Sequence, residues 1–400
     1  LCAGFCSAGV DTYALAVVPT GGISWIARTQ GFDLGIVISA SHNPAEDNGI
    51  KLIGPDGRKA PESLERWIEE HVDDEITDRP LLEAVGQIYS RRHEVMLYSD
   101  WLTTLVPERL DGMKIVMDCA HGAAFEVAPT VFRALGAELT IIGDDPNGVN
   151  INEEGGATKP SVVQALTQEL GADLGISFDG DADRAVFSDS KGRLINGDRT
   201  MAIWAQHWRH EGRLDPAIVV GTVMSNMGFE NYLKGEGITL ERVDVGDKYV
   251  SAKLNETGAQ VGGEQSGHII FPESGPTGDG LATALHLARV MKREGKTAAE
   301  LYDSFDNWPQ VLVNVKVANK EGWDSDPAVV SALATANGHM EGNGRINVRA
   351  SGTQPIVRVM VESSSVTTRD TVAKSVVDAL LAARGGEVYS TVDLTHSLGE

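Results

Sequence analysis

The stretch Ile36-Val-Ile-Ser-Ala-Ser-His-Asn-Pro-Ala-Glu-Asp-Asn-Gly-Ile-Lys-Leu-Ile53 combines a buried strand with a loop of reactive groups. Its apolar start predicts a strand, and the small, turn-forming residues that follow predict a tight loop before an apolar run resumes at Ile50. Ser41 therefore lies at a strand's end, beside His42 and shortly before Lys51. A hydroxyl held in this way can carry a phosphoryl group in covalent catalysis. The alternative is an ordinary connection whose serines cap backbone amides.

The composition is that of a globular protein with more than one domain. At about 100–200 residues per domain, a chain of 400 residues predicts two to four. The net charge of −23 would repel phosphate backbones, which argues against nucleic acid and anionic membranes as partners. Cys2, Cys6 and Cys119 form no C-x-x-C pair, which suits a cytoplasmic protein. No apolar run approaches the roughly 20 residues of a membrane span.

Strands and helices alternate through most of the chain. In one segment the apolar run 114–119 predicts a strand, 126–135 a helix and 136–142 the next strand, a spacing that favours parallel pairing. After Pro309 the residues alternate as in antiparallel strands. We therefore expect an α/β protein of three consecutive α/β domains with mixed, largely parallel sheets, and a smaller C-terminal α+β domain. The expected domains are 1–93, 94–194, 195–308 and 309–400.

Three alternating acidic residues follow a predicted buried strand. The carboxylates of Asp179, Asp181 and Asp183 point to one side if the backbone stays extended, and they repel one another unless a cation lies among them. A calcium-binding EF-hand loop needs glycine and glutamate where this chain has Arg184 and Ser190. Mg²⁺ suits a site of few protein oxygens that leaves room for water and phosphate. The alternative is a solvated acidic turn.

The glycine-rich stretch Gly262-Gly-Glu-Gln-Ser-Gly-His268 lacks the G-x-G-x-x-G spacing of a dinucleotide site. Glu264 and Ser266 can face one way, as acceptor and donor for adjacent sugar hydroxyls. His268 can transfer a proton or contact phosphate. The same residues can instead cap the strand that begins near Ile269.

A basic turn occurs late in this acidic chain. Arg349-Ala-Ser-Gly-Thr-Gln-Pro355, followed by Arg358, combines two guanidinium groups, two hydroxyls and flexible backbone amides, which are the elements of a phosphate cradle. A surface loop is the alternative. Other histidines show no metal-ligand spacing and are not predicted to be functional: His93, His207, His210 and His286.

Four loops, in this order, resemble the signature loops of the α-D-phosphohexomutase superfamily: 39–44, 179–184, 263–268 and 349–353. Within the superfamily, the third loop, together with 221–228 and 245–250, is similar to the bacterial phosphoglucosamine mutases. The likeness runs over nearly the whole chain.

The resemblance implies four domains around a central cleft, with Ser41 as a phosphoserine that also ligates Mg²⁺ beside the three aspartates. Lys51, helped by Arg184 and His268, is expected to transfer a proton or to stabilise charge at the reacting oxygen. The other implied substrate contacts are Glu264 and Ser266 for sugar hydroxyls, and Arg349, Ser351, Gly352, Thr353 and Arg358 for the non-reacting phosphate.

In such enzymes the phosphoserine donates to glucosamine 6-phosphate, and a sugar 1,6-bisphosphate turns over within the cleft and returns its other phosphate to serine. The implied product is glucosamine 1-phosphate, a precursor of UDP-N-acetylglucosamine and of the bacterial wall. A small sugar phosphate is thus the expected partner, and a homodimer is left open. Alternatives are a phosphomannomutase or phosphoglucomutase, in which methionine often replaces Gln265, a sugar-phosphate hydrolase, and a chain that binds sugar phosphate without turnover.

The chain also departs from the family pattern. Gln354 stands where phosphoglucosamine mutases usually have glutamate, and Ala182 where glycine is usual. The family's first strand and an arginine-bearing loop ahead of the serine domain are missing. We therefore expect an N-terminal truncation of several tens of residues, with an exposed sheet edge and a lost phosphate contact.

Overall fold

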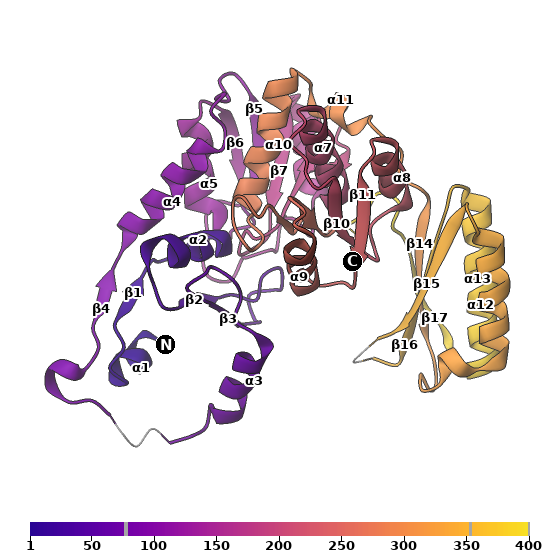
Figure 1. Ribbon diagram of the computed structural model, residues 1–400, viewed down its shortest axis with the longest axis horizontal. Helices are drawn as coiled ribbons and strands as arrows, with labels where there is room; N and C mark the ends of the chain where they lie inside the picture. The colour runs from indigo at the N-terminus through magenta and orange to yellow at the C-terminus, as the bar shows by residue number, and fades with distance from the viewer. Residues whose placement is uncertain (76–78, 352–353, 399–400) are drawn as a thin grey trace.

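A computed structural model describes residues 1–75, 79–351 and 354–398. The chain folds into four successive units, and the last one stands apart from the other three (Figure 1). This arrangement confirms the four-domain α/β architecture expected from the sequence. Within the described ranges, no helix combines the length and the apolar character needed to cross a membrane.

The first unit comprises α1 (Cys2–Ser7), β1 (Thr12–Ala14), α2 (Thr20–Gln30), β2 (Gly35–Ile38), β3 (Ile50–Ile53), α3 (Glu62–His71), the 3₁₀ helix η1 (Leu82–Ala84) and β4 (Ile88–Ser90). β2 pairs antiparallel with β3, and β1 pairs parallel with β4. Mixed pairing was expected here, and β2 and β3 form an antiparallel pair in a sheet of their own. The reason is local: parallel pairing needs a crossover of a dozen or more residues, whereas β2 returns into β3 through a shorter loop without a helix.

The second unit comprises α4 (Arg92–Thr104), β5 (Lys114–Asp118), α5 (Ala124–Ala134), β6 (Glu138–Ile142), α6 (Ser161–Leu170), β7 (Leu174–Phe178), β8 (Ala185–Ser188) and β9 (Leu194–Ile195). Its sheet has the order β6-β5-β7-β8-β9. The strands β6, β5 and β7 run parallel, whereas the β7–β8 and β8–β9 pairs are antiparallel. In β5, Ile115 and Met117 pack into one core and Val116 into another, because successive side chains of a strand point to opposite faces.

The third unit comprises α7 (Gly197–His210), β10 (Ile218–Thr222), α8 (Met227–Gly235), β11 (Thr239–Val243), α9 (Asp247–Thr257), β12 (Gly262–Gly263), β13 (Ile269–Ile270), α10 (Gly280–Glu294) and α11 (Ala298–Tyr302). Its sheet has the order β11-β10-β12-β13, and only the β12–β13 pair is antiparallel among these described strands. Asn196 and Asp279 cap α7 and α10 by accepting hydrogen bonds from the Arg199 and Ala282 amides.

The fourth unit comprises β14 (Gln310–Lys316), the 3₁₀ helix η2 (Trp323–Ser325), α12 (Pro327–Met340), β15 (Gly344–Ala350), β16 (Ile356–Ser363), α13 (Val366–Arg384) and β17 (Glu387–Asp393). Its strands pair antiparallel in the order β15-β16-β14-β17, and α12 and α13 cover one face of the sheet (Figure 1). The smaller antiparallel α+β domain expected after Pro309 is therefore confirmed.

The hydrophobic cores separate the last unit from the rest. One continuous cluster runs through the first three units and includes Ile26, Ile115 and Trp204. The fourth unit has its own core, in which Val359 and Leu380 are fully buried. The first three units therefore form one packed body, and Met224, Met360 and Leu394 form a separate buried cluster between it and the fourth unit.

Candidate active site

A cavity of about 350 Å³ opens where the first three units meet. Its walls come from the loop between β2 and β3, the aspartate turn between β7 and β8, and the segments that precede α9 and β13. The structure brings together in this cavity seven of the residues predicted from sequence: Ser41, Lys51, Asp183, Arg184, Glu264, Ser266 and His268.

Ser41 has an uncommon backbone conformation. Its φ of +56° lies in the left-handed region, which residues with a side chain seldom adopt. Its amide donates a hydrogen bond to Ser39 Oγ over 2.9 Å, and its own hydroxyl donates to Asp179 Oδ2, also over 2.9 Å. The hydroxyl thus faces the aspartates from a strained turn, and such strain persists only where surrounding contacts hold it.

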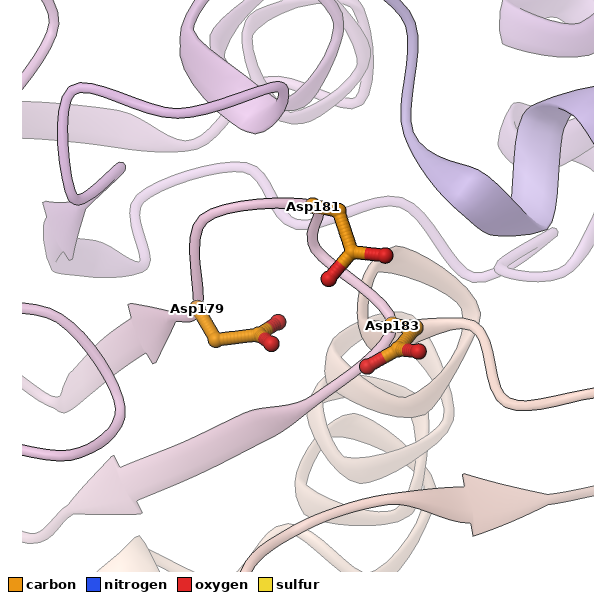
Figure 2. A group of neighbouring side chains, drawn as sticks. All are labelled: Asp179, Asp181 and Asp183. Carbon is orange, nitrogen blue, oxygen red and sulfur yellow. The ribbon is translucent and has the colours of Figure 1, made fainter. Parts of the chain in front are cut away.

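Three carboxylates gather in the turn between β7 and β8 and point toward one another (Figure 2). One oxygen from each of Asp179, Asp181 and Asp183 lies within 4.8 Å of the other two, and all three residues are buried. Asp181 Oδ1 is buried and has no hydrogen-bond partner among the described residues. Several buried carboxylate oxygens at this spacing suit a hard divalent cation, so the three aspartates can bind a metal ion.

Lys51 reaches the aspartates from β3. Its Nζ forms an ion pair with Asp181 and lies 3.3 Å from Asp183 Oδ2. Burial alone lowers the pKa of Lys51, but the carboxylates of Asp183 and Asp181 outweigh burial and raise that pKa above its ordinary value. Lys51 therefore brings a positive charge into the cavity that the Ser41 hydroxyl also faces.

The aspartates experience different surroundings. Burial, reinforced by the charges of Asp183 and Asp181, raises the pKa of Asp179. Burial acts on Asp183 in the same direction, but His268 and Lys51 outweigh it and hold the pKa of Asp183 well below its usual range. His268 Nδ1 lies 3.4 Å from Asp183 Oδ1, and this carboxylate raises the pKa of His268 although burial opposes it. His268 and Asp183 therefore form a buried pair at the cavity wall in which each group favours the charged form of the other.

Arg184 follows the last of the three aspartates and lines the cavity. Its backbone amide donates to Asp179 Oδ1 over 3.1 Å, which closes the turn around the carboxylates. Its charge opposes the rise in the pKa of Asp179 that burial causes.

The glycine-rich loop of the third unit lies against the aspartate turn. Glu264 Oε1 accepts a hydrogen bond from the Gly246 amide over 2.9 Å, and Ser266 is buried at the cavity wall. Gly267 has φ +92°, and a Cβ at this position would lie 2.4 Å from the Ala185 carbonyl oxygen. Only glycine fits there, and its small size lets the loop place Glu264 and Ser266 beside the second unit.

Of the predicted phosphate-binding residues, the three that the structure describes, Arg349, Ser351 and Arg358, do not line this cavity. Arg349 on β15 stands directly opposite Arg358 on β16. Burial, reinforced by the charge of Arg358, lowers the pKa of Arg349. The Ser351 amide donates to the Ile356 carbonyl, and Lys320 Nζ donates to the Ser351 carbonyl. Gly352 and Thr353 lie outside the described residues.

Several cavity residues were not predicted individually. Lys59 and Asp247 form an ion pair that joins the first unit to the third, and Asp247 Oδ2 lies 3.8 Å from His268 Nε2. His268 and Lys59 outweigh the effect of burial and lower the pKa of Asp247. Asp247 lies in the 245–250 stretch that carried the family resemblance, whereas Lys59 and Leu398 belong to no motif and had no sequence signal.

Four family models match successive parts of the chain. They describe phosphoglucomutase/phosphomannomutase alpha/beta/alpha domain I over residues 1–79, domain II over 97–192, domain III over 196–308 and the C-terminal domain over 312–379. The chain therefore belongs to the phosphoglucomutase/phosphomannomutase family. A relative, the phosphoglucosamine mutase of Desulforamulus reducens, is 45% identical over 368 residues, which are 92% of this chain and 83% of the relative.

Solved structures share the fold. A phosphoglucomutase/phosphomannomutase family protein from Burkholderia thailandensis superposes with a TM-score of 0.77 at 23% identity, covering 96% of this chain and 86% of that one. The N-acetylphosphoglucosamine mutase of Aspergillus fumigatus, in complex with GlcNAc-6P and magnesium, has a TM-score of 0.66 at 21% identity, covering 91% and 92%. At these identities the likeness establishes the fold alone.

Proposed function

We propose that this chain is a phosphoglucosamine mutase, an isomerase that interconverts glucosamine 6-phosphate and glucosamine 1-phosphate for UDP-N-acetylglucosamine and cell-wall synthesis. The observation that carries the proposal is the hydrogen bond from Ser41 Oγ to Asp179 Oδ2, because it sets a nucleophilic hydroxyl beside a metal-binding triad in a cavity. The 45% identity to the Desulforamulus reducens phosphoglucosamine mutase supports an amino sugar as the substrate.

Ser41 would carry the transferable group as phosphoserine. In the forward direction the bond between Ser41 Oγ and phosphorus breaks, a bond from the sugar O1 to phosphorus forms, and the proton of that sugar hydroxyl is removed. The resulting sugar 1,6-bisphosphate turns over and returns its 6-phosphate to Ser41. Lys51, with Arg184 and His268, would move the proton or offset the charge of the transferring group, because all three line the same cavity.

Asp179, Asp181, Asp183 and the Ser41 oxygen are the proposed metal ligands. When bound, Mg²⁺ would neutralise negative charge at the transferring phosphoryl group. The unpartnered Asp181 Oδ1 and the all-oxygen donor set support this ion, as does the magnesium in the Aspergillus fumigatus relative. Lys51 and His268 offset part of the charge of Asp181 and Asp183, but Asp179 is still repelled by both of these carboxylates.

The substrate contacts divide between two units. Glu264 and Ser266, which line the cavity, would bind sugar hydroxyls. The volume of this cavity is typical of small-molecule sites. Arg349 and Arg358 would bind the non-reacting phosphate with Ser351, Gly352 and Thr353. Like charges directly opposite each other across two strands are unfavourable, so an anion bound beside Arg349 and Arg358 would relieve their repulsion.

The test is intact mass before and after incubation with glucose 1,6-bisphosphate, followed by turnover assays. We expect a gain of one phosphate and preferential turnover of glucosamine 6-phosphate. Preference for mannose or glucose phosphates would identify the neutral-hexose mutase instead. Release of inorganic phosphate faster than isomerisation would identify a hydrolase. Binding of sugar phosphate without turnover would contradict the mutase.

Domain boundaries, cellular location and oligomeric state complete the proposal. Domain boundaries at 93/94, 194/195 and 308/309 are supported by the family models, which end and begin near them. A cytoplasmic location is supported by three free cysteines, of which Cys6 and Cys119 are buried. A homodimer stays a prediction, which light scattering of the purified chain would test.

A further inference from the structure

Asn152 connects the second unit to the loop that carries Ser41. It lies in the long loop between β6 and α6, and its side chain is buried. Its Nδ2 donates one hydrogen bond to the Ser41 carbonyl over 3.0 Å and another to the Asn43 carbonyl over 3.1 Å. One amide group thus holds both sides of the serine turn, 111 and 109 residues away in sequence.

The Ser41 turn needs contacts from outside its own loop. Because Ser41 is held at φ +56°, its conformation is sparsely populated unless neighbouring groups fix it. The bond from the Ser41 amide to Ser39 Oγ is local and moves with the loop. The two bonds from Asn152 are different, because they fix the turn relative to the unit that carries the aspartates.

Asn152 is itself held in place. Its φ of +60° is left-handed. Its backbone N–H donates to the Ala120 carbonyl over 2.9 Å, and its backbone carbonyl accepts from Lys159 Nζ over 3.2 Å. The metal-binding turn packs against the same point. A Cβ added to Gly180, which lies between two of the aspartates, would come within 2.5 Å of the Ser41 carbonyl oxygen and 2.7 Å of Asn152 Nδ2.

We propose that Asn152 is a positioning residue for phosphoryl transfer: its side-chain amide fixes the position of the Ser41 turn relative to the three aspartates. This inference rests on the proposed function and adds a residue to it. Phosphoryl transfer depends mainly on positioning and charge, and a misplacement of about 1 Å can slow a reaction about 100-fold. The same contact would serve both half-reactions, because Ser41 is the leaving group in one and the nucleophile in the other.

The structural alternative is that Asn152 merely suits a left-handed turn, since asparagine tolerates positive φ better than most residues. Two variants separate these roles. Asn152→Gly keeps the backbone conformation accessible and removes the amide group. Asn152→Asp keeps the size and the tolerance of positive φ, but it replaces the donor with a carboxylate that repels the Ser41 and Asn43 carbonyls.

Asn150→Ala is the matched control. Asn150 lies two residues away on the same loop. Among the described residues its side chain bonds only within that loop: Nδ2 donates to the Asp145 carbonyl, and Oδ1 accepts from the Asn147 backbone amide. Its loss therefore disturbs the loop without touching Ser41.

The experiment measures single-turnover transfer from phosphorylated enzyme to glucosamine 6-phosphate, the affinity of unphosphorylated enzyme for that sugar phosphate, and thermal unfolding. We expect Asn152→Gly and Asn152→Asp to slow transfer by about 10- to 100-fold, with affinity within about twofold of the unaltered protein. Asn150→Ala is expected to transfer at the unaltered rate.

Two results would overturn the inference: transfer at the unaltered rate in a folded Asn152→Gly or Asn152→Asp protein, or an equal slowing in Asn150→Ala. If Asn152→Gly does not fold, Asn152→Asp decides, and failure of both to fold would assign Asn152 a purely structural role. Failure of the unaltered protein to form phosphoserine would instead overturn the proposed function, so the two failures are distinguishable.

Discussion

The Ser41 hydroxyl meets Asp179 Oδ2 across 2.9 Å, although 138 residues separate the two in sequence. Ser41 lies in the loop that follows β2 of the first unit, and Asp179 directly follows β7 of the second. The nucleophile and the metal-binding set therefore come together only when these two units pack against each other. Changes on either side of this contact should affect the chemistry before they affect the binding of sugar.

The serine that carries phosphate can be identified within the loop. Ser41→Ala should gain no phosphate from a sugar bisphosphate and should lose at least about 1,000-fold in turnover, because it removes the hydroxyl that contacts Asp179 in the cavity. Ser39→Ala removes only the bond to the Ser41 amide, so it should still gain one phosphate. Intact mass and turnover check both variants, and phosphate uptake by Ser41→Ala would refute the assignment.

Metal binding should stabilise the folded chain. A ligand that binds only the folded state at 100 times its Kd adds about 2.7 kcal/mol to the free energy of unfolding. We therefore expect Mg²⁺ to raise the unfolding midpoint and chelator to reverse the rise. Asp181→Asn should lose most of this response, whereas Asp100→Asn, an exposed change on α4, should keep it. An equal response in both variants would place the metal elsewhere.

An ion pair within the fourth unit, Arg345 with Glu362, also bonds to the backbone of the third unit. Arg345 Nε lies 2.7 Å from Glu362 Oε2, and its Nη atoms donate to the carbonyls of Val223 and Ser225. Because Glu362 is fully buried, Arg345→Met leaves an unpaired charge and should cost about 3 kcal/mol in the free energy of unfolding.

The control for Arg345→Met is Lys374→Ala, which breaks an exposed pair with Asp378 and should cost no more than about 1 kcal/mol. Urea unfolding measures both variants, and limited proteolysis reports whether the fourth unit loosens. Equal stabilities for the two variants would show that the buried pair does not hold the units together.

A buried histidine should make stability depend on pH. Burial, reinforced by the charge of Arg289, lowers the pKa of His286 to about 3, and its Nε2 lies 2.9 Å from Ser274 Oγ. As pH falls from about 6.5 toward 3, the unfolded chain binds a proton at this site that the folded chain does not, so the free energy of unfolding falls by up to about 1.4 kcal/mol per pH unit. Above about pH 6.5 the site contributes no such slope.

The measurement is urea unfolding at about pH 5 and about pH 7.5, chosen on either side of the ordinary histidine pKa. His286→Gln should lose less stability between these two conditions than the unaltered protein does. His93→Gln, an exposed change, should match the unaltered protein. An identical loss in all three proteins would show that His286 is not the source.

Much of this architecture was predictable because its signals are local. The apolar run of β7 followed by alternating aspartates predicted carboxylates that project to one side of an extended backbone. The carboxylates do gather, but the backbone turns between them, with Ala182 at φ +56°. The change of pattern after Pro309 predicted the antiparallel unit. The first unit was harder, because the sequence of a strand does not state which neighbour it pairs with, and β2 and β3 form a pair of their own.

The sequence by itself determined which chemical groups are present and on which turns they lie, because strand periodicity and turn residues act over a few positions. The family resemblance, and no local pattern, implied that Ser41 lies beside the aspartates, and the tertiary structure shows the contact with Asp179. Only the tertiary structure decided that Asn152 bonds to the serine turn and that Arg349 lies outside the cavity. These relationships are contacts between units that are far apart in the chain. They arise from packing of whole domains, in which any single residue contributes too little to leave a pattern in the sequence.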